Sequence, residues 1–157
     1  AQMDVPDENG RTPLSYAAEY GQEAIVRLLL EKDVKADIAD KYGRTPLYYA
    51  INNTLDYEHD SLVRLLLDKG AQTEILADDG QTLLSYATEF GNKTIVHVLL
   101  DKGAKVDILD KYGRTPLSYA AEHGFETIVQ SLLNSNTQAN MSCRDGRTPL
   151  SYAAEHG

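Results

Sequence analysis

The chain has 157 residues, of which 42% are hydrophobic and 25% are charged, an ordinary balance for a globular protein. Its 15 basic and 24 acidic residues give a net charge of −9, so it lacks the basic excess needed to bind nucleic acid or an anionic membrane surface. No apolar run approaches membrane-spanning length, and the single cysteine, Cys143, excludes an internal disulfide, so we expect a reducing, cytoplasmic location.

An internal repeat dominates the chain. The wording Gly-Arg-Thr-Pro-Leu-Ser-Tyr-Ala-Ala-Glu occurs three times, and two looser copies also occur. Its threonine falls in steps of 33, 37, 33 and 33 residues, at Thr12, Thr45, Thr82, Thr115 and Thr148. A period of this size indicates a solenoid of stacked supersecondary units. One frame covers the chain, with repeats at 1–33, 34–70, 71–103 and 104–136 and a partial repeat at 137–157.

Each repeat is expected to hold a polar turn, a first helix, a glycine and a second helix. Threonine followed by proline starts the first helix, because threonine supplies an N-cap oxygen and proline at N1 has no amide hydrogen to leave unpaired. Left-handed glycines should end the first helices, at Gly21, Gly91 and Gly124. The second helices carry apolar residues at helical spacing, such as Ile25, Leu28 and Leu29. They should stop at Gly70 and Gly103, with Asp33 and Asn136 in that place in two other repeats.

This pattern resembles an ankyrin array. The matching residues are Thr12-Pro13-Leu14, Ala17-Ala18, Gly21, Ile25-Val26, Leu28-Leu29-Leu30 and the Gly70-Ala71 or Gly103-Ala104 step. The resemblance implies an all-α ankyrin-repeat solenoid of helix-turn-helix units joined by β-turn fingers, with nine or ten short helices here. It also implies a protein-binding module whose partners contact the concave side, made by the fingers and first helices. The Ser-Tyr-Ala wording resembles arrays attached to fungal NACHT/NLR-type receptors.

Tyrosine recurs on this expected binding side. A ladder of one tyrosine per first helix comprises Tyr16, Tyr49, Tyr86, Tyr119 and Tyr152. Tyrosine is enriched at interfaces, but the alternative is packing between repeats. Two further tyrosines lie at finger tips, where the alternative is a solvated turn. The residues that we expect to contact a partner are Tyr42, Tyr49, Tyr86, Tyr112, Tyr119, Arg44, Arg114, Asp78, Asp79, Phe90 and His123.

Charged residues also recur in register. An arginine follows the finger glycine at Arg11, Arg44, Arg114 and Arg147, and a glutamate ends the first helix at Glu19, Glu89, Glu122 and Glu155. These could pair between neighbouring repeats or contact a partner. The third repeat departs, with Gln81 for arginine and Leu83 for proline, and the second is four residues longer between its helices, around residues 52–60. Such breaks are either functional or neutral. The net charge favours a partner with a basic or mixed-charge patch.

Catalysis has little support in the sequence. No zinc-protease, phosphate-loop, nucleophile-elbow or paired-cysteine motif is present, and the four histidines are scattered. Glu58-His59-Asp60 is a poor metal or acid/base cluster, because adjacent residues rarely converge on one atom. We therefore expect no enzyme activity, cofactor or metal. The chain is interpreted as a piece of a longer protein, either the recognition module of an intracellular receptor or scaffold, or a structural spacer or regulatory arm, or the non-catalytic part of an enzyme.

Overall fold

A computed structural model of the protein describes residues 3–52, 59–74 and 80–135, together with residues 146, 148, 151 and 154. These residues form eight α-helices and no strand, in agreement with the predicted all-α fold. Most of the fifth repeat, where further helices were predicted, lies outside the described residues. The chain divides into two compact parts, an N-terminal part of residues 1–77 and a C-terminal part of residues 78–157.

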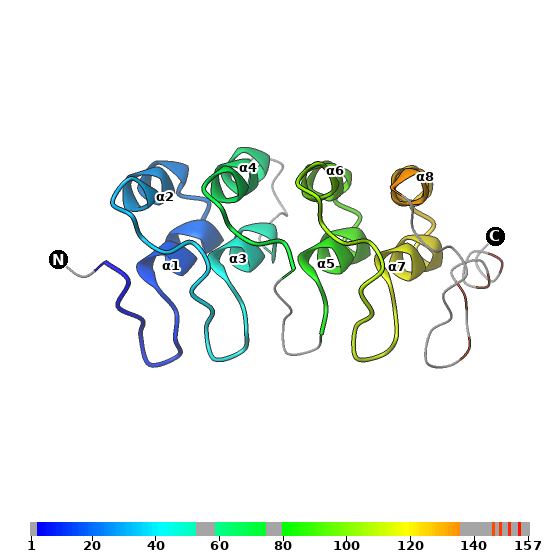
Figure 1. Ribbon diagram of the computed structural model, residues 1–157, viewed down its shortest axis with the longest axis horizontal. Coiled ribbons are helices and arrows are strands. Elements are labelled where there is room, and N and C mark those ends of the chain that lie inside the picture. The colour runs from blue at the N-terminus through cyan, green and yellow to red at the C-terminus, as the bar shows by residue number, and fades with distance from the viewer. Residues whose placement is uncertain are drawn as a thin grey trace. The chain divides into compact units, whose positions relative to one another are not determined.

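Each part contains two helix pairs, one pair per repeat (Figure 1). In the N-terminal part these helices are α1 (Pro13–Glu19), α2 (Glu23–Leu30), α3 (Pro46–Asn52) and α4 (Asp60–Asp68). In the C-terminal part they are α5 (Leu83–Glu89), α6 (Lys93–Asp101), α7 (Pro116–Glu122) and α8 (Glu126–Asn134). First helices pack on first helices, α1 with α3 and α5 with α7, while second helices pack on second helices. Each part is therefore a two-layer stack with its fingers beyond the first helices.

The predicted N-caps are confirmed. The Oγ1 atoms of Thr12, Thr82 and Thr115 accept the backbone N–H three residues later, at 3.2, 3.0 and 3.2 Å. In all three caps the threonine is buried and also contacts the hydroxyl of the serine at that later position. Thr82 caps α5 although Leu83 stands where the first helices α1, α3 and α7 have proline. The threonine oxygen is therefore sufficient to start the helix.

The predicted left-handed glycines are confirmed as well, and they determine where neighbouring repeats meet. Gly21 and Gly91 have φ angles of 64° and 68°. A Cβ atom built on Gly21 would lie 2.2 Å from His59 Nε2, and one on Gly91 would lie 2.7 Å from Phe125 Cζ. His59 and Phe125 are the N-cap residues of α4 and α8. The residue that opens one second helix therefore packs directly over the glycine that ends the first helix of the preceding repeat.

The helix-ending residue Asp33 also behaves as expected. It is the one non-glycine residue with positive φ in the described part of the chain, at 56°, where Gly70 and Gly103 have 91° and 81°. Aspartate tolerates this region better than most residues because its short polar side chain can hydrogen-bond locally. Asn136 lies outside the described residues.

The apolar face of α2 differs from the sequence expectation. Val26 and Leu30 are buried, whereas Ile25 is 47% exposed and Leu28 is 56% exposed. Their frame equivalents in α4, Leu62 and Leu65, are buried, and α4 packs on α2. Within the described residues α2 has a second helix packed on one side alone. The spacing identified a helix correctly, but it could not show which of its apolar residues are exposed.

Candidate protein-interaction surface

An aspartate at the start of the turn holds the finger tips of the first, second and fourth repeats. Asp40 Oδ1 accepts the backbone N–H groups of Tyr42 and Arg44 at 2.8 and 2.9 Å, and its own carbonyl accepts the Gly43 N–H at 3.1 Å. The Asp110 turn repeats the two carboxylate bonds at the same distances. Both aspartates are buried. The backbone of each tip is therefore fixed before any partner arrives.

These rigid turns present two aromatic rings. Tyr42 is 50% exposed and Tyr112 is 58% exposed, which confirms that both tip tyrosines are accessible. A basic group lies over each ring: Arg44 Cζ is 4.6 Å from the Tyr42 ring centre, and Lys111 Nζ is 5.0 Å from that of Tyr112. The cation contact limits ring rotation while leaving about half of each side chain open to solvent.

Two members of the tyrosine ladder are placed differently from the tips. Tyr49 and Tyr119 are buried, and their hydroxyls donate to Oδ2 of Asp40 and Asp110, both at 2.6 Å. Burial, followed by the hydrogen bond to the carboxylate, raises the pKa of each phenol. Little of either ring is left for a partner, so the alternative of structural packing describes these two residues better. Tyr16, at the equivalent position of α1, is 37% exposed.

The tyrosine hydroxyl in turn affects the finger aspartate. Burial acts to raise the pKa of Asp40, but hydrogen bonds from Tyr49, from the Arg44 backbone and from the Arg44 side chain outweigh it and lower the pKa. Asp40 Oδ2 also receives an ion pair from Arg44 Nη2 at 2.8 Å. One buried carboxylate thus joins the finger turn, the first helix and an arginine.

The arginine and glutamate ladders pair within repeats. Arg11 bonds Glu19 through Nη2, and Arg114 Nη1 lies 2.9 Å from Glu122 Oε2. In these two repeats the ion pair joins the residue after the finger to the end of the first helix of the same repeat. Arg11 also contacts the next repeat by stacking, since its Cζ lies 4.1 Å from the ring centre of Tyr49. Arg147 and Glu155 lie outside the described residues.

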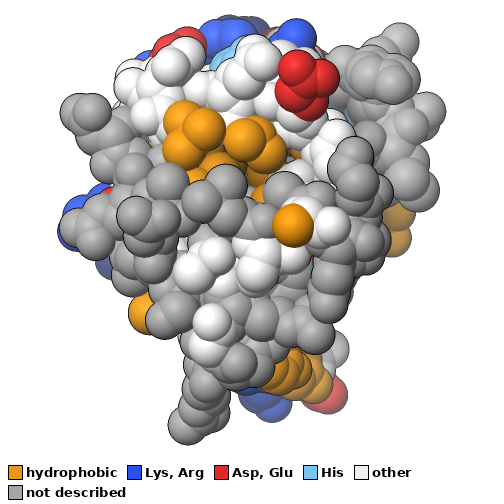
Figure 2. Space-filling view, turned by 90° about the vertical axis from the view of Figure 1, so that its right-hand side faces the viewer, with side chains coloured by type: hydrophobic (Ala, Val, Ile, Leu, Met, Phe, Trp, Pro, Cys, Tyr) orange, Lys and Arg blue, Asp and Glu red, His pale blue; other side chains and the backbone are white. Residues whose placement is uncertain are grey.

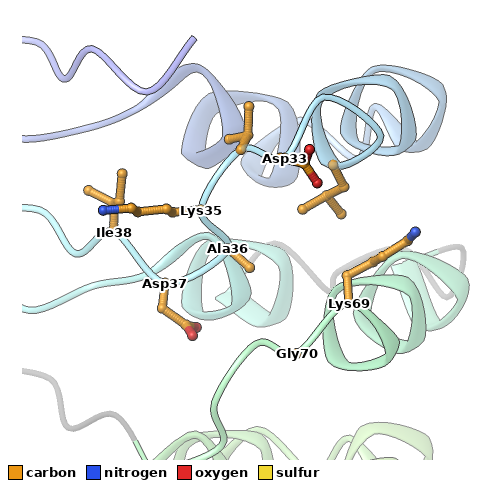
Figure 3. A pocket seen from close by; sticks show the side chains of 9 residues that line it. Asp33, Lys35, Ala36, Asp37, Ile38, Lys69 and Gly70 are labelled. Atoms are coloured by element: carbon orange, nitrogen blue, oxygen red, sulfur yellow. The ribbon is translucent and has the colours of Figure 1, made fainter. Parts of the chain in front are cut away.

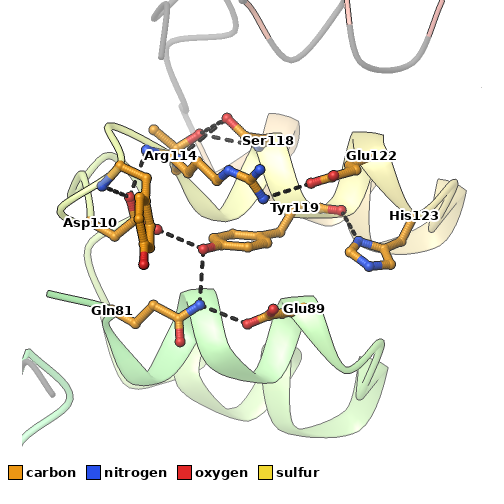
Figure 4. A network of polar contacts seen from close by, with 10 residues as sticks. Gln81, Glu89, Asp110, Arg114, Ser118, Tyr119, Glu122 and His123 are labelled. Carbon is orange, nitrogen blue, oxygen red and sulfur yellow. Dashed lines mark hydrogen bonds and ion pairs between the residues drawn. The ribbon is translucent and has the colours of Figure 1, made fainter. Parts of the chain in front are cut away.

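The third repeat replaces this ion pair with an amide network (Figure 4). Gln81 Nε2 donates to Glu89 Oε2 at 2.7 Å and to the Tyr119 hydroxyl at 3.0 Å. Because that hydroxyl donates onward to Asp110, a continuous hydrogen-bond chain runs from α5 to the following finger. The sequence showed the exchange of arginine for glutamine, but not this connection to the next repeat.

Aromatic groups lie at the ends of α5 and α7. Phe90 is 63% exposed, and its ring centre is 4.8 Å from that of Tyr86. His123 is exposed, stacks on Phe125 at 5.5 Å and donates from Nδ1 to the Tyr119 carbonyl at 3.0 Å. Both predicted contact residues, Phe90 and His123, are therefore accessible, while Asp78 and Asp79 lie outside the described residues.

Two hollows that the sequence did not indicate lie at the ends of second helices. One of about 540 Å³ lies beside the loop that follows α2, among Asp33, Lys35, Asp37 and Lys69 (Figure 3). Another of about 520 Å³ lies at the matching place beside α6 and α8. In the first hollow the labelled side chains point in different directions (Figure 3), and Asp37 already accepts the Gln72 N–H at 3.0 Å. The recurrence of the two hollows at equivalent positions indicates a gap between successive loops.

The end of the C-terminal part shows a further apolar region. Figure 2 views the molecule from the side of α8 and shows a cluster of hydrophobic side chains in the upper part of that face, with other hydrophobic side chains scattered toward its edges. Leu133 of α8 is 44% exposed.

Across the described residues, no group of three or more histidine, cysteine, aspartate or glutamate side chains could hold a metal ion. None of the helices described is both long and apolar enough to span a bilayer.

The family assignment agrees with this geometry. The family described as Ankyrin repeats (3 copies) matches residues 1–75 and 84–157, so the chain belongs to the ankyrin-repeat family. No curated protein matches the chain. Ankyrin repeats are generally protein–protein interaction modules, and the family is typically non-catalytic. The predicted fold class is confirmed by both the helices and the family match.

Proposed function

We propose that the chain binds a protein partner through its finger tips and the exposed ends of its first helices, and that it is the recognition module of a larger intracellular receptor or scaffold. The observation that carries the proposal is the pair of fixed turns presenting Tyr42 and Tyr112. Each turn is held by two backbone hydrogen bonds to a buried aspartate. Because the backbone is already ordered, little conformational entropy is lost when a partner covers the ring.

The charge of the chain bears on the kind of partner. A net charge of −9 favours a partner with a basic or mixed-charge patch and disfavours nucleic acid and anionic membranes. A reducing, cytoplasmic setting suits the single cysteine. The resemblance to arrays of fungal NACHT/NLR-type receptors supports a receptor as the parent protein. The module itself would perform no chemistry.

A spacer or regulatory arm is the second candidate, and one observation favours it. The buried Tyr49 and Tyr119, together with the ion pairs inside repeats, show that much of the repeated surface chemistry is used for internal contacts. Residues that recur in this way at the same position of each repeat stabilise the stacking of repeats rather than the recognition of a partner. The exposed tip tyrosines favour the recognition module, because about half of each side chain remains open to solvent.

The test compares tip variants with variants on the second helices. A partner is first isolated by cross-linking to the chain, and its affinity is then measured by calorimetry. Tyr42→Ala and Tyr112→Ala should weaken binding about tenfold or more, as expected for aromatic anchors. Arg27→Ala and Lys93→Ala, two exposed residues on α2 and α6, serve as controls and should leave affinity unchanged.

The opposite pattern would place the partner on the second helices and contradict the proposal. Circular dichroism should show that all four variants keep the wild-type helix content, because each change removes an exposed side chain. A purified parent protein that binds its partners equally well without this chain would favour the spacer.

A further inference from the structure

The third repeat has an acidic residue that its own repeat does not neutralise. In the first and fourth repeats an arginine after the finger pairs with the glutamate that ends the first helix. In the third repeat Gln81 takes that place and gives Glu89 an amide hydrogen bond at 2.7 Å. An amide satisfies one carboxylate oxygen but carries no charge. No ion pair involves Glu89 within the described part of the chain.

The surrounding network does not supply the missing positive charge. Glu89, Asp110 and Glu122 appear in it with one guanidinium, that of Arg114, which pairs with Glu122 (Figure 4). The charge of Glu89 reaches its neighbours: burial is the main cause that raises the pKa of Tyr119, and the Glu89 carboxylate adds to it. Glu89 is itself half-buried at the C-terminal end of α5, where the helix dipole further favours a cation.

An exposed aromatic surface lies next to this carboxylate. Phe90 follows Glu89 directly, is 63% exposed and packs at 4.8 Å against Tyr86, one turn earlier. A carboxylate beside aromatic rings is the combination that a guanidinium group recognises, because its planar cation stacks on the ring while its N–H groups bond the oxygens. A lysine ammonium would gain the charge attraction but not the planar stacking.

The first repeat displays the arrangement that the third repeat lacks. Arg11 Cζ lies 3.9 Å from the centre of the Tyr16 ring, and the same guanidinium bonds Glu19. Tyr16 and Glu19 are the frame equivalents of Tyr86 and Glu89. The fold therefore shows that a tyrosine and a glutamate at these two positions hold a guanidinium between them.

We propose that Tyr86, Glu89 and Phe90 form a recognition site for an arginine side chain of the protein partner. The partner's guanidinium would lie on the aromatic pair and bond the Glu89 carboxylate, as Arg11 does within the first repeat. The inference rests on the proposed function and names the chemistry of the partner at one point. The substitution of arginine by glutamine at position 81 is what opens the site.

The test uses acetyl-arginine-methylamide as the probe and the complete chain labelled with ¹⁵N. Titration at constant ionic strength should give saturable shifts of the Glu89 and Phe90 backbone amides. The matching citrulline derivative has the same shape without the charge and should give none. Gln81→Arg should restore the internal ion pair and weaken probe binding about tenfold or more, and Glu89→Gln should do the same.

Glu19→Gln is the matched control, because Arg11 already occupies that carboxylate, and it should leave probe binding unchanged. The proposal is overturned if the arginine probe gives no saturable shift at α5, if the citrulline derivative shifts the same amides, or if Gln81→Arg binds the probe as well as wild type. Such a failure is separate from that of the proposed function. If the affinity of a partner still depends on Tyr42 and Tyr112, the proposed interaction function stands and only the arginine site is refuted.

Discussion

Removing one buried hydroxyl gives a direct test of how the fingers are held. Tyr49→Phe deletes the hydrogen bond from the phenol to Asp40 Oδ2 at 2.6 Å and leaves the ring in place. The Asp40 side chain has no solvent exposure, so water cannot replace the lost donor. Arg44 and two backbone N–H groups continue to bond the carboxylate and keep it ionised.

The expected loss follows from the kind of bond removed. Hydrogen bonds to charged groups contribute about 1.5–3 kcal/mol, and the remaining partners place this one near the lower end, at about 1.5–2 kcal/mol. For a chain of this length each kcal/mol lowers the Tm by about 2–4 °C, so a fall of about 3–8 °C is expected. Urea unfolding followed by circular dichroism at pH 7 measures the free energy of unfolding directly.

The matched control is Tyr16→Phe, which removes the same kind of bond, to Asp7 at 2.7 Å, at a solvent-exposed place. Water can replace the donor there, so the loss should be clearly smaller. An equal loss in both variants, or no loss in Tyr49→Phe, would refute the argument from burial.

The cost of Tyr49→Phe should also depend on pH. The folded-state pKa of Asp40 is lowered, because hydrogen bonds outweigh the opposing effect of burial. Its contribution to stability is therefore fully present above the unfolded pKa, near 3.9, and is lost as the pH falls through the folded value. The difference between wild type and variant should shrink below about pH 4. A difference that grew in acid would contradict this sign.

Two further pairs of variants, measured by urea unfolding, test the contact between neighbouring repeats and the packing of the core. Gly91→Ala should destabilise the protein more than Gly124→Ala. Both glycines have φ of 68°, a conformation that costs alanine about 1–2 kcal/mol. Only at Gly91 would the new Cβ also meet a described neighbour, Phe125. Equal losses would show that the Phe125 ring moves aside freely. Ile95→Ala should cost about 2–5 kcal/mol because the side chain is fully buried, whereas Ile25→Ala, at a position 47% exposed, should cost about 1 kcal/mol or less. A larger loss for Ile25→Ala than for Ile95→Ala would contradict the burial of the two side chains.

The local features of the fold could be predicted because they depend on a few adjacent residues. The cap at Thr82 needs only a hydroxyl three residues before an N–H group, so it forms even where Leu83 replaces proline. The left-handed glycine at Gly91 is likewise a property of one residue. The exposure of Ile25 and Leu28 could not be predicted, because it depends on which face of α2 meets another helix.

The part of the candidate site that depends on adjacent residues could also be predicted from the sequence. Tyr42 and Tyr112 follow a turn-opening aspartate, and this short-range pattern places them at exposed tips. Tyr49 carries the same side chain but is buried, with its hydroxyl on Asp40 and its ring against Arg11 of the preceding repeat. The contact with Arg11 joins residues far apart in the sequence, so only the folded structure could show it.

The joint between fingers has a consequence for how such a chain changes over generations. Neighbouring fingers in the N-terminal part are linked by the Lys41 N–H and the Asn9 carbonyl at 3.0 Å, a contact that uses no side chain. The residue that covers the helix-ending glycine is histidine at one joint and phenylalanine at another. A gene segment encoding one whole repeat can therefore be copied or deleted and still find an acceptable neighbour.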